Sequence, residues 1–221
     1  MDIPYAILLD GGFVRVKLGN KQRPLTASTV QALIEAIGTA LEHHFQPSSL
    51  HLYRAYFYDA KPLDDTLIHP LNGKPLALAN TPMARNNRIL HKELERIPFL
   101  ALRYGHLKCR GWGLHRRWIH SALQKGGQHR AIEEGDVVPQ TEQKGVDMRI
   151  GLDIASLTLK KQVGLIVLVT ADSDFIPAMK FARREGAQLC LARLEHGVTD
   201  ELLEHADLDL NVDLSSLKSL S

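Results

Sequence analysis

Residues Val163 to Phe175 read Val-Gly-Leu-Ile-Val-Leu-Val-Thr-Ala-Asp-Ser-Asp-Phe and join an apolar run to two acids. The run is too short to span a membrane, and its branched aliphatic side chains predict a strand buried on both faces, as in parallel sheets. Asp172 and Asp174 follow the strand, and a helix is predicted from Phe175 to Arg184. Both carboxylates therefore belong at the carboxyl edge of the sheet, where open α/β sheets place their ligands.

This pair of carboxylates has two interpretations. Two negative charges one residue apart repel each other unless a cation, a proton or a hydrogen-bond donor compensates them, which favours a bound metal ion. The simpler interpretation is that one aspartate only caps the following helix. We favour the metal site because more carboxylates are predicted at the same edge.

Asp10 is the next acid at a strand end. It follows a short apolar strand predicted from Tyr5 to Leu9 and precedes the pair Gly11-Gly12. By itself an Asp-Gly-Gly run is an ordinary turn signal. In a parallel sheet, however, the carboxyl ends of the strands share one edge, so we expect Asp10 to lie near Asp172 and Asp174.

Asp147 opens a predicted helix that runs to about Lys161, with apolar residues recurring at helical spacing. The helix dipole favours an acid in the first turn, which is a sufficient structural reason for one aspartate. Asp153 comes six residues later, about a third of a turn away around the helix, so we do not place it in the same metal shell.

The rest of the chain alternates between predicted strands and helices. We predict strands at residues 49–58, 99–107, 133–139, 187–194 and 208–212, and helices at 26–45, 85–96 and 199–205, the first with Thr26 or Ser28 as its N-cap. Residues 60–82 contain four of the ten prolines and predict a long irregular connection. The serine-rich tail, residues 214–221, is expected to fray.

Length and composition limit the class of protein. The chain has 221 residues, 44% of them hydrophobic, which suits a single domain over residues 1–213 with insertions near 60–82 and 103–143. Its two cysteines, Cys109 and Cys190, are too far apart for a disulfide framework or a zinc ribbon. No basic segment followed by an apolar one opens the chain, and no apolar run reaches membrane length, so we expect a soluble cytoplasmic protein.

Positive charge is concentrated in one segment, although the net charge is only +2. No Asp or Glu occurs between Ala101 and Ile132, and tryptophans and glycines are interleaved with the cations. Cations attract phosphates and indole rings stack on unpaired bases, so the segment predicts RNA contact. Alternatively, the tryptophans belong to the core and the cations to a solvated face. The positive residues are Arg103, Lys108, Arg110, Arg116, Arg117, Lys125 and Arg130.

Carboxylates gathered at one sheet edge bind a hard divalent ion, typically Mg²⁺ or Mn²⁺. Such an ion can activate water against a phosphodiester and needs no histidine or serine nucleophile. The acids would repel RNA, so positive groups must hold its backbone. Lys144 and Arg149, which flank Asp147, are the nearest candidates, and Lys108, Arg110, Arg116 and Arg117 are further ones.

Three motifs in this order resemble the NYN domain family, the LabA-like branch of the PIN-like nucleases. They are Asp10-Gly11-Gly12-Phe13, Lys144-Gly145-Val146-Asp147 and Thr170-Ala171-Asp172-Ser173-Asp174-Phe175. The resemblance extends from about residue 5 to residue 195. It implies a PIN-like Rossmannoid α/β fold, a three-layer sandwich around a mostly parallel sheet. It also implies a Mg²⁺- or Mn²⁺-dependent ribonuclease site formed by Asp10, Asp147, Asp172 and Asp174.

The chain departs from this family at Phe13. Many members have Asn three residues after the first Asp, so a polar group near the metal or the substrate is missing here or is supplied by another residue. A second function therefore stays open, that of a non-catalytic RNA-binding or regulatory adaptor with the same fold.

Other phosphate-handling folds fit less well. A haloacid-dehalogenase-like phosphatase needs a second acid at the position of Gly12, and the Gly-x-x-x-x-Gly-Lys-Ser/Thr phosphate loop is absent. Arg116 occupies the third glycine position of a dinucleotide fingerprint that would start at Gly111. A receiver-like domain would need a phosphoacceptor such as Asp59 after its third strand, whereas Asp59 follows the second predicted one.

Overall fold

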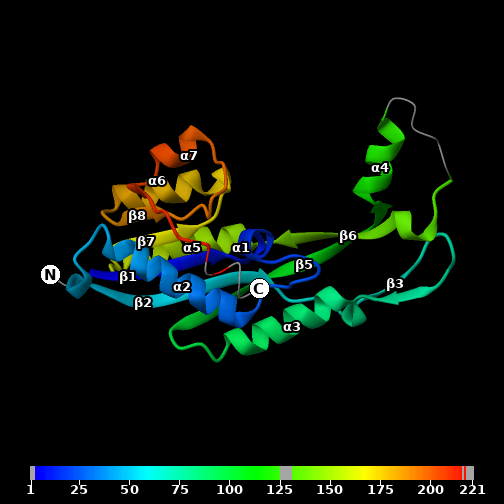
Figure 1. Ribbon diagram of the computed structural model, residues 1–221, viewed down its shortest axis with the longest axis horizontal. Coiled ribbons are helices and arrows are strands. Elements are labelled where there is room, and N and C mark those ends of the chain that lie inside the picture. The colour runs from blue at the N-terminus through cyan, green and yellow to red at the C-terminus, as the bar shows by residue number, and fades with distance from the viewer. Residues whose placement is uncertain (1–2, 125–130, 216, 218–221) are drawn as a thin grey trace.

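The structure is a computed structural model that describes residues 3–124, 131–215 and 217. Within these residues, seven strands form the main sheet in the order β6-β5-β2-β1-β7-β8-β9 (Figure 1). All neighbouring strands are parallel except β5 and β6, which are antiparallel. The strands are β1 (Ile3–Asp10), β2 (Leu50–Ala60), β5 (Leu100–Leu114), β6 (Val137–Lys144), β7 (Leu165–Val169), β8 (Gln188–Leu191) and β9 (Leu208–Asp209).

Helices cover both faces of the sheet, because the central strands have apolar side chains on each side. On β1, Ile7 and Leu9 pack on one face and Ala6 and Leu8 on the other. The first face is covered by α1 (Gly11–Leu18), α2 (Ala27–Glu42) and α3 (Pro82–Leu94). The second is covered by α5 (Val146–Leu159), α6 (Ile176–Arg184) and α7 (Asp200–Glu204). The predicted three-layer α/β sandwich with a mostly parallel sheet is confirmed.

The predicted elements outside the two insertions are present, with boundaries that differ by a few residues. The strand after Val163 is β7, the strand before Asp10 is β1, and Thr26 is the N-cap of α2, as predicted. The predicted turn at Gly11-Gly12 is wrong, because these glycines are the first two residues of α1. A Cβ on Gly11 would lie 2.4 Å from the Tyr58 carbonyl oxygen, so the close approach of α1 to β2 explains this glycine.

The two insertions are more ordered than the sequence indicated. Residues 60–82 contain a hairpin of β3 (Thr66–Ile68) and β4 (Pro75–Ala77), where we expected an irregular connection. The strand predicted to end at Leu107 continues to Leu114, and Gly111 and Gly113 lie within it, at or beside an irregularity of the β5–β6 register. A further helix, α4 (Arg116–Leu123), was not predicted, and the strand predicted at 133–139 is a short 3-10 turn followed by β6.

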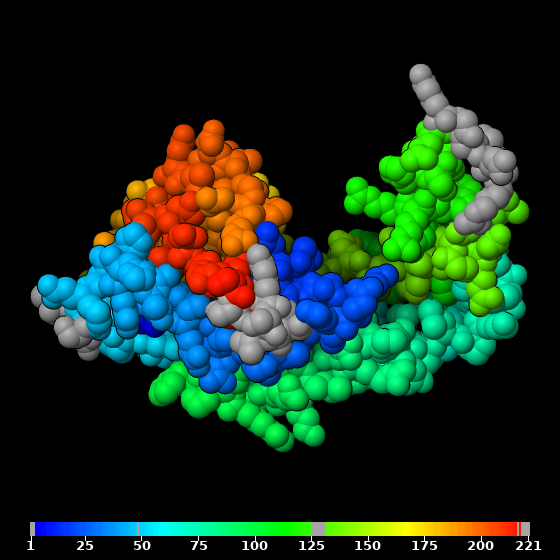
Figure 2. Space-filling model, viewed as in Figure 1, coloured from blue at the N-terminus to red at the C-terminus, as the bar shows by residue number. Residues whose placement is uncertain are grey.

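The insertions pack against each other and form an arm beside the sandwich. His69, just after β3, places its ring 4.7 Å from that of Trp112 on β5, and its Nε2 lies 3.3 Å from the Glu134 carbonyl oxygen. The arm of β5, β6 and β3 extends away from α6 and α7, and α4 stands on its far end (Figure 1). Figure 2 shows the surface hollowed between α4 and the α6–α7 side of the molecule, with α1 at the bottom of the hollow.

The carboxyl-terminal residues that the structure describes are not frayed throughout. Leu214 and Leu217 are each 1% exposed and belong to the core on the α2 side of the sheet. Residue 216 and residues 218–221 of the predicted tail lie outside the described residues, as do Lys125, Arg130 and the glycines between them. The boundaries of the domain stay a prediction.

Gly11→Ala should destabilise the fold, because the new methyl group would overlap the Tyr58 carbonyl oxygen. We expect a loss of about 3 kcal/mol, the upper range for overpacking, which corresponds to a fall of about 6–12 °C in the midpoint of thermal unfolding. Gly151→Ala in α5 is the matched control. No atom lies within 4 Å of its new Cβ, so it should raise the midpoint slightly. A Gly11→Ala midpoint equal to that of the wild type would contradict this account.

Candidate active site

The parallel register of β1 and β7 brings the first and last motifs together. Leu9 of β1 is paired with Val169 of β7, so the next residues, Asp10 and Thr170, leave the sheet side by side. The Thr170 hydroxyl donates a hydrogen bond of 3.3 Å to Asp10 Oδ2 and accepts one of 3.2 Å from the backbone N–H of Asp172. Thr170 is fully buried and so links the two acids at the sheet edge.

Asp10 is fixed by its role as the N-cap of α1. Its Oδ1 accepts hydrogen bonds from the backbone N–H groups of Gly12 and Phe13, at 3.0 and 3.2 Å. Burial raises the pKa of Asp10 above its ordinary value, and the charge of Asp147 adds to the rise, outweighing the hydrogen bonds that lower it. Asp10 therefore carries its negative charge at a cost that a nearby cation would reduce.

Asp172 and Asp174 lie on the turn between β7 and α6. Asp172 Oδ1 accepts a hydrogen bond of 2.9 Å from the backbone N–H of Asp174, so Asp172 caps the short 3-10 helix Ser173–Phe175. The capping interpretation is thus correct for Asp172, but it uses only one of the two carboxylate oxygens. Asp172 and Asp174 are both exposed.

Asp147 lies in the first turn of α5, as the helical spacing predicted. Gly145, the residue before the helix, has a left-handed backbone with φ of 74°, which suits glycine and turns the chain from β6 into α5. Asp147 is exposed, and its pKa is raised by partial burial and then by the charges of Asp172 and Asp174. The electrostatic coupling therefore joins all four predicted acids.

Among the described residues, no basic side chain neutralises the charge of the four acids. In the part of the chain that the structure describes, no Lys, Arg or His forms an ion pair with any of them. Asp153 is different, because it accepts hydrogen bonds from Tyr58 and Arg103. Four coupled carboxylates without a cation are a suitable set of hard oxygen ligands for a divalent ion.

The four acids do not form a complete, preformed metal-coordination site. No group of three or more His, Cys, Asp or Glu among the described residues is arranged to hold a metal ion. Mg²⁺ is usually bound by only one or two carboxylates, with water and substrate phosphate completing its shell. The chemistry of the four acids therefore fits such an ion, while the protein alone does not complete its coordination.

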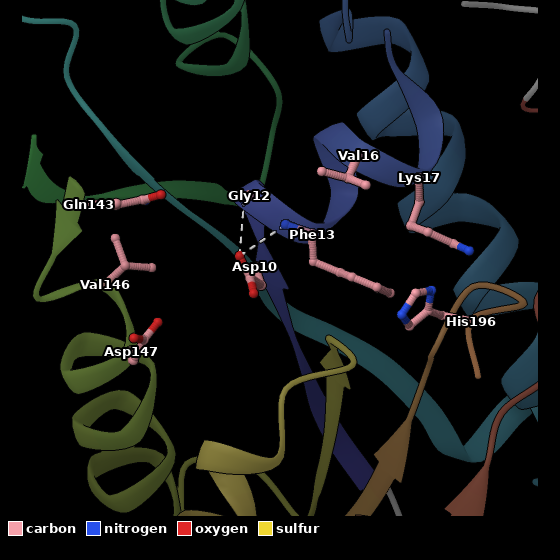
Figure 3. Close-up of a pocket in the computed structure, with 9 residues that line it drawn as sticks. All are labelled: Asp10, Gly12, Phe13, Val16, Lys17, Gln143, Val146, Asp147 and His196. Carbon is pink, nitrogen blue, oxygen red and sulfur yellow. Dashed lines mark hydrogen bonds between the residues drawn. The ribbon is translucent and has the colours of Figure 1, made fainter. Parts of the chain in front are cut away.

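A cavity of about 390 Å³ opens beside two of the acids. Asp147 and Gln143 lie on one side of it, Phe13, Lys17 and His196 lie on the other, and Asp10 lies between the two sides, next to Phe13 (Figure 3). Sequence analysis did not assign Gln143, Lys17, His196 or Thr170 to the site. Thr170 had a usable signal, since it is the first residue of the third motif.

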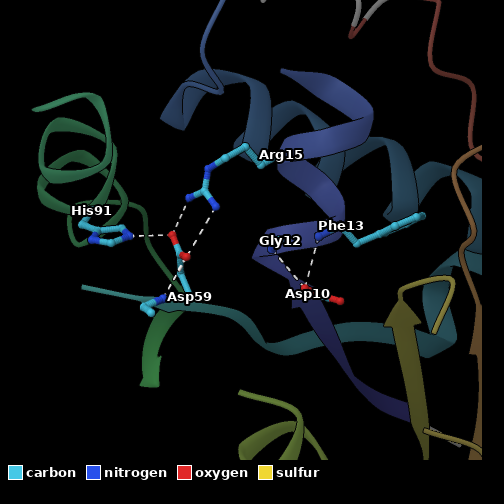
Figure 4. Close-up of polar contacts among 7 residues, drawn as sticks. Asp10, Gly12, Phe13, Arg15, Asp59 and His91 are labelled. Atoms are coloured by element: carbon cyan, nitrogen blue, oxygen red, sulfur yellow. Dashed lines mark hydrogen bonds and ion pairs between the residues drawn. The ribbon is translucent and has the colours of Figure 1, made fainter. Parts of the chain in front are cut away.

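A buried ion-pair cluster holds α1, the helix that begins at Asp10. Asp59 at the end of β2 is 3% exposed, and its Oδ2 accepts a hydrogen bond of 2.5 Å from Arg15 and lies 2.7 Å from His91 Nε2 (Figure 4). Burial raises the pKa of Asp59, but the hydrogen bond from His91 and the pairing with Arg15 outweigh it and lower the pKa. The carboxylate ties α1 and α3 to the sheet, so it is not exposed as a phosphoacceptor would have to be.

The predicted basic residues form two groups, and Arg149 belongs to neither. Lys108, Arg110 and Lys144 surround Glu142 of β6, because β6 pairs with β5. Arg110 Nε donates to Glu142 Oε2 at 2.5 Å, and Lys144 Nζ lies 3.8 Å from Oε1. The segment that lacks acids in sequence therefore has one beside it in space, although the group keeps a positive balance.

Arg116 and Arg117 form the second group, exposed on α4 at the far end of the arm. Arg149 is half-buried, and its Nε donates to the Tyr104 carbonyl oxygen at 2.6 Å. Trp112 is half-buried against His69, which agrees with the alternative that this indole has a structural role.

The sequence model of the family described as NYN domain matches residues 83–211, which is more than half of the chain. The chain belongs to the NYN domain family. The match contains the second and third motifs and therefore Asp147, Asp172 and Asp174, while Asp10 lies before it. The family predicted from the three motifs is confirmed, and with it the likeness to PIN-like nucleases.

Other comparisons add little to the NYN assignment. No curated protein matches the chain. A crystal structure of a protein of unknown function, VPA0982 from Vibrio parahaemolyticus RIMD 2210633, aligns over 96% of this chain and 94% of its own, with 16% identity and a TM-score of 0.47. Among the described residues, no helix is long and apolar enough to cross a membrane.

Asp10→Asn should stabilise the fold at neutral pH. Folding raises the pKa of Asp10 above its ordinary value of 3.8, so the ionised carboxylate destabilises the folded state above that pH, and the effect disappears below it. Asn keeps the N-cap acceptor without the charge. We expect a midpoint of thermal unfolding above that of the wild type at pH 7, and no difference at pH 3.

Comparison of Asp10→Ala with Asp10→Asn separates the cap from the charge. Both variants lose the charge but only Ala loses the cap, so Asp10→Ala should be less stable than Asp10→Asn by about 1 kcal/mol. If Asp10→Asn were less stable than the wild type at pH 7, the unfavourable charge that we assign to Asp10 would be contradicted.

Proposed function

We propose that this NYN-domain protein is a metal-dependent ribonuclease that hydrolyses RNA phosphodiesters at Asp10, Asp147, Asp172 and Asp174. The main support is that four electrostatically coupled carboxylates share one sheet edge without a cationic partner among the described residues. Such an arrangement opposes folding unless a bound cation compensates it, so a function in cation binding accounts for its presence.

Mg²⁺ or Mn²⁺ is the cofactor that this donor set fits. Asp10 and Asp172 each use Oδ1 in a backbone cap, which fixes the carboxylate. Neither Oδ2 takes part in the cap, although that of Asp10 accepts a hydrogen bond from Thr170. Asp147 and Asp174 are exposed and can turn toward the same ion. When bound, the ion would polarise a phosphate oxygen and supply an activated water for hydrolysis.

The residues of the chain have distinct tasks in this proposal. Thr170 holds Asp10 and the backbone of Asp172 in a fixed relation, and the Asp59–Arg15 pair keeps α1, and hence Asp10, against the sheet. The negative edge repels RNA, so cations must bind its backbone on either side. Lys144 is near the acids, whereas Lys108, Arg110, Arg116 and Arg117 lie further along the arm.

A non-catalytic RNA-binding adaptor is the second candidate. It is favoured by the lack of any three ligands arranged for a metal among the described residues, and by Phe13 in place of the usual Asn. Both functions need the arm, but only the nuclease needs the four acids.

Asp172→Asn should abolish cleavage and leave RNA binding intact. Asn keeps the acceptor that caps the 3-10 helix but lacks the charge, so the fold is retained and the ion is bound more weakly. We expect cleavage of a labelled single-stranded RNA in Mg²⁺ or Mn²⁺ to fall by more than about 100-fold, since even the loss of a residue supporting a metal ligand costs about 10–100-fold.

Asp200→Asn is the matched control for this measurement, because it removes the same charge from the first turn of α7, outside the four acids. It should cleave like the wild type, and chelator should stop both. Cleavage by Asp172→Asn at the wild-type rate would contradict the proposed site. RNA binding without cleavage in either metal by the wild type would establish the adaptor instead.

Arg116→Ala combined with Arg117→Ala should weaken RNA binding and reduce its dependence on salt. Each lost phosphate contact lowers the slope of log affinity against log salt concentration by about 0.7 for single strands, so the double variant should lower it by about 1.4. The control is Lys92→Ala with Arg96→Ala, which removes two exposed charges from the α3 region. Wild-type affinity of the α4 variant at every salt concentration would exclude α4 from the RNA surface.

A further inference from the structure

The side of the cavity opposite Asp147 is aromatic and basic. Phe13 and Lys17 are one turn apart on α1 and therefore share a helix face. His196, from the loop after β8, meets Phe13 edge to face, with ring centroids 5.8 Å apart and an angle of 78° between the rings (Figure 3). Two rings and one ammonium group thus line a single wall across from Asp147, with Asp10 between the wall and Asp147 (Figure 3).

The loop that carries His196 has an unusual backbone. Leu194 and Glu195, the two residues before it, both have positive φ values, 48° and 57°. Side chains other than glycine seldom adopt this conformation, and consecutive examples are kept only when surrounding contacts compensate them. Such outliers gather at ligand-binding sites, so the strained backbone favours a binding role for the loop that carries His196.

Several contacts hold this backbone in place. Leu194 is 2% exposed and packs in the core, while Arg193 pairs with Asp209 of β9 at 3.0 Å. Arg193 Nη1 also donates to the His196 carbonyl oxygen at 2.9 Å. The imidazole is therefore presented to the cavity on a braced loop, while the His196 residue itself remains exposed.

The cavity has room and chemistry for one nucleotide. Its volume of about 390 Å³ lies in the range of small-molecule sites, about 300–1,000 Å³. Flat aromatic faces stack on bases, and an ammonium group attracts a backbone phosphate. In an edge-to-face pair at least one ring keeps a face that its partner does not cover.

We propose that Phe13 and His196 form a base-binding subsite that takes one unpaired nucleotide of single-stranded RNA, with Lys17 contacting a phosphate beside that nucleotide. This inference rests on the proposed function and adds to it the class of substrate. A paired base has both faces covered by its neighbours in the duplex, so the subsite selects single strands. Phe13 thus has a role of its own here, as a specificity-determining residue in the place of the usual Asn.

The test measures stacking directly and without cleavage. The probe is a short single-stranded RNA with one 2-aminopurine, whose fluorescence falls when the base stacks, titrated with the 221-residue chain in chelator. We expect quenching with the wild type and at least about tenfold weaker binding of the same RNA in a duplex. Phe13→Leu keeps an apolar side chain on α1 but has no flat face, so it should lose the quenching and about 5- to 100-fold in affinity.

Three further variants decide whether the effect belongs to the subsite. Phe13→Tyr should restore quenching, because it restores the ring. His196→Ala should reduce quenching, whereas Phe99→Leu, which removes a ring that is 68% exposed just before β5, should change nothing. Thermal unfolding of each variant checks that the fold is retained.

The result separates this inference from the nuclease proposal. Unchanged quenching and affinity in folded Phe13→Leu would overturn the subsite, whether or not the wild type cleaves RNA. Quenching that depends on Phe13, in a protein that cleaves no RNA with either metal, would support the subsite and reject the nuclease. Equal binding of single-stranded and duplex RNA would also overturn the inference.

Discussion

The pairing of β1 between β2 and β7 is the constraint on which the rest of the structure depends. Its register places Asp10 beside Tyr58 on one side and, one residue beyond the ladder, beside Thr170 on the other. A shift of one residue would turn Asp10 toward a helix layer and bring apolar side chains to the edge, because side chains alternate along a strand. The same register brings Asp59 to the carboxyl end of β2, where Arg15 and His91 reach it.

The carboxylates at the sheet edge have pKa values shifted in opposite directions. Asp59 is buried and has two basic partners, so its pKa is lowered and its charge helps to hold α1 and α3. Burial and then the charges of neighbouring acids raise the pKa values of Asp10 and Asp147, and no ion-pair partner among the described residues offsets the rise. A carboxylate paired with cations stabilises the fold. A carboxylate that lies near other acids and has no cationic partner destabilises the folded state, and a bound cation would remove that destabilisation. This contrast separates the structural acid from the candidate active-site acids in an NYN-domain protein.

The two insertions pack together and form one structural unit, the arm. His69 and Trp112 come from different insertions and meet in the arm, which extends β5 and β6 beyond the sandwich and carries α4. Cations that are close in sequence therefore occupy separate places, with Lys108 and Arg110 near Glu142 and with Arg116 and Arg117 on α4. These cations belong to β5 and α4 of the arm, whereas the four acids lie at the starts of α1, α5 and the 3-10 helix Ser173–Phe175 in the sandwich.

The sequence by itself determined the α/β class, the central strands, most helices and the family, because buried parallel strands and amphipathic helices leave strong local patterns. It also indicated the edge of the sheet to which Asp10, Asp172 and Asp174 belong, since parallel strands end together. Only the tertiary structure decided that Gly11 opens a helix, that Glu142 lies beside the basic residues, and that His196 meets Phe13 across 183 positions of sequence numbering. These features depend on which surfaces approach each other after folding, and no local periodicity records such an approach.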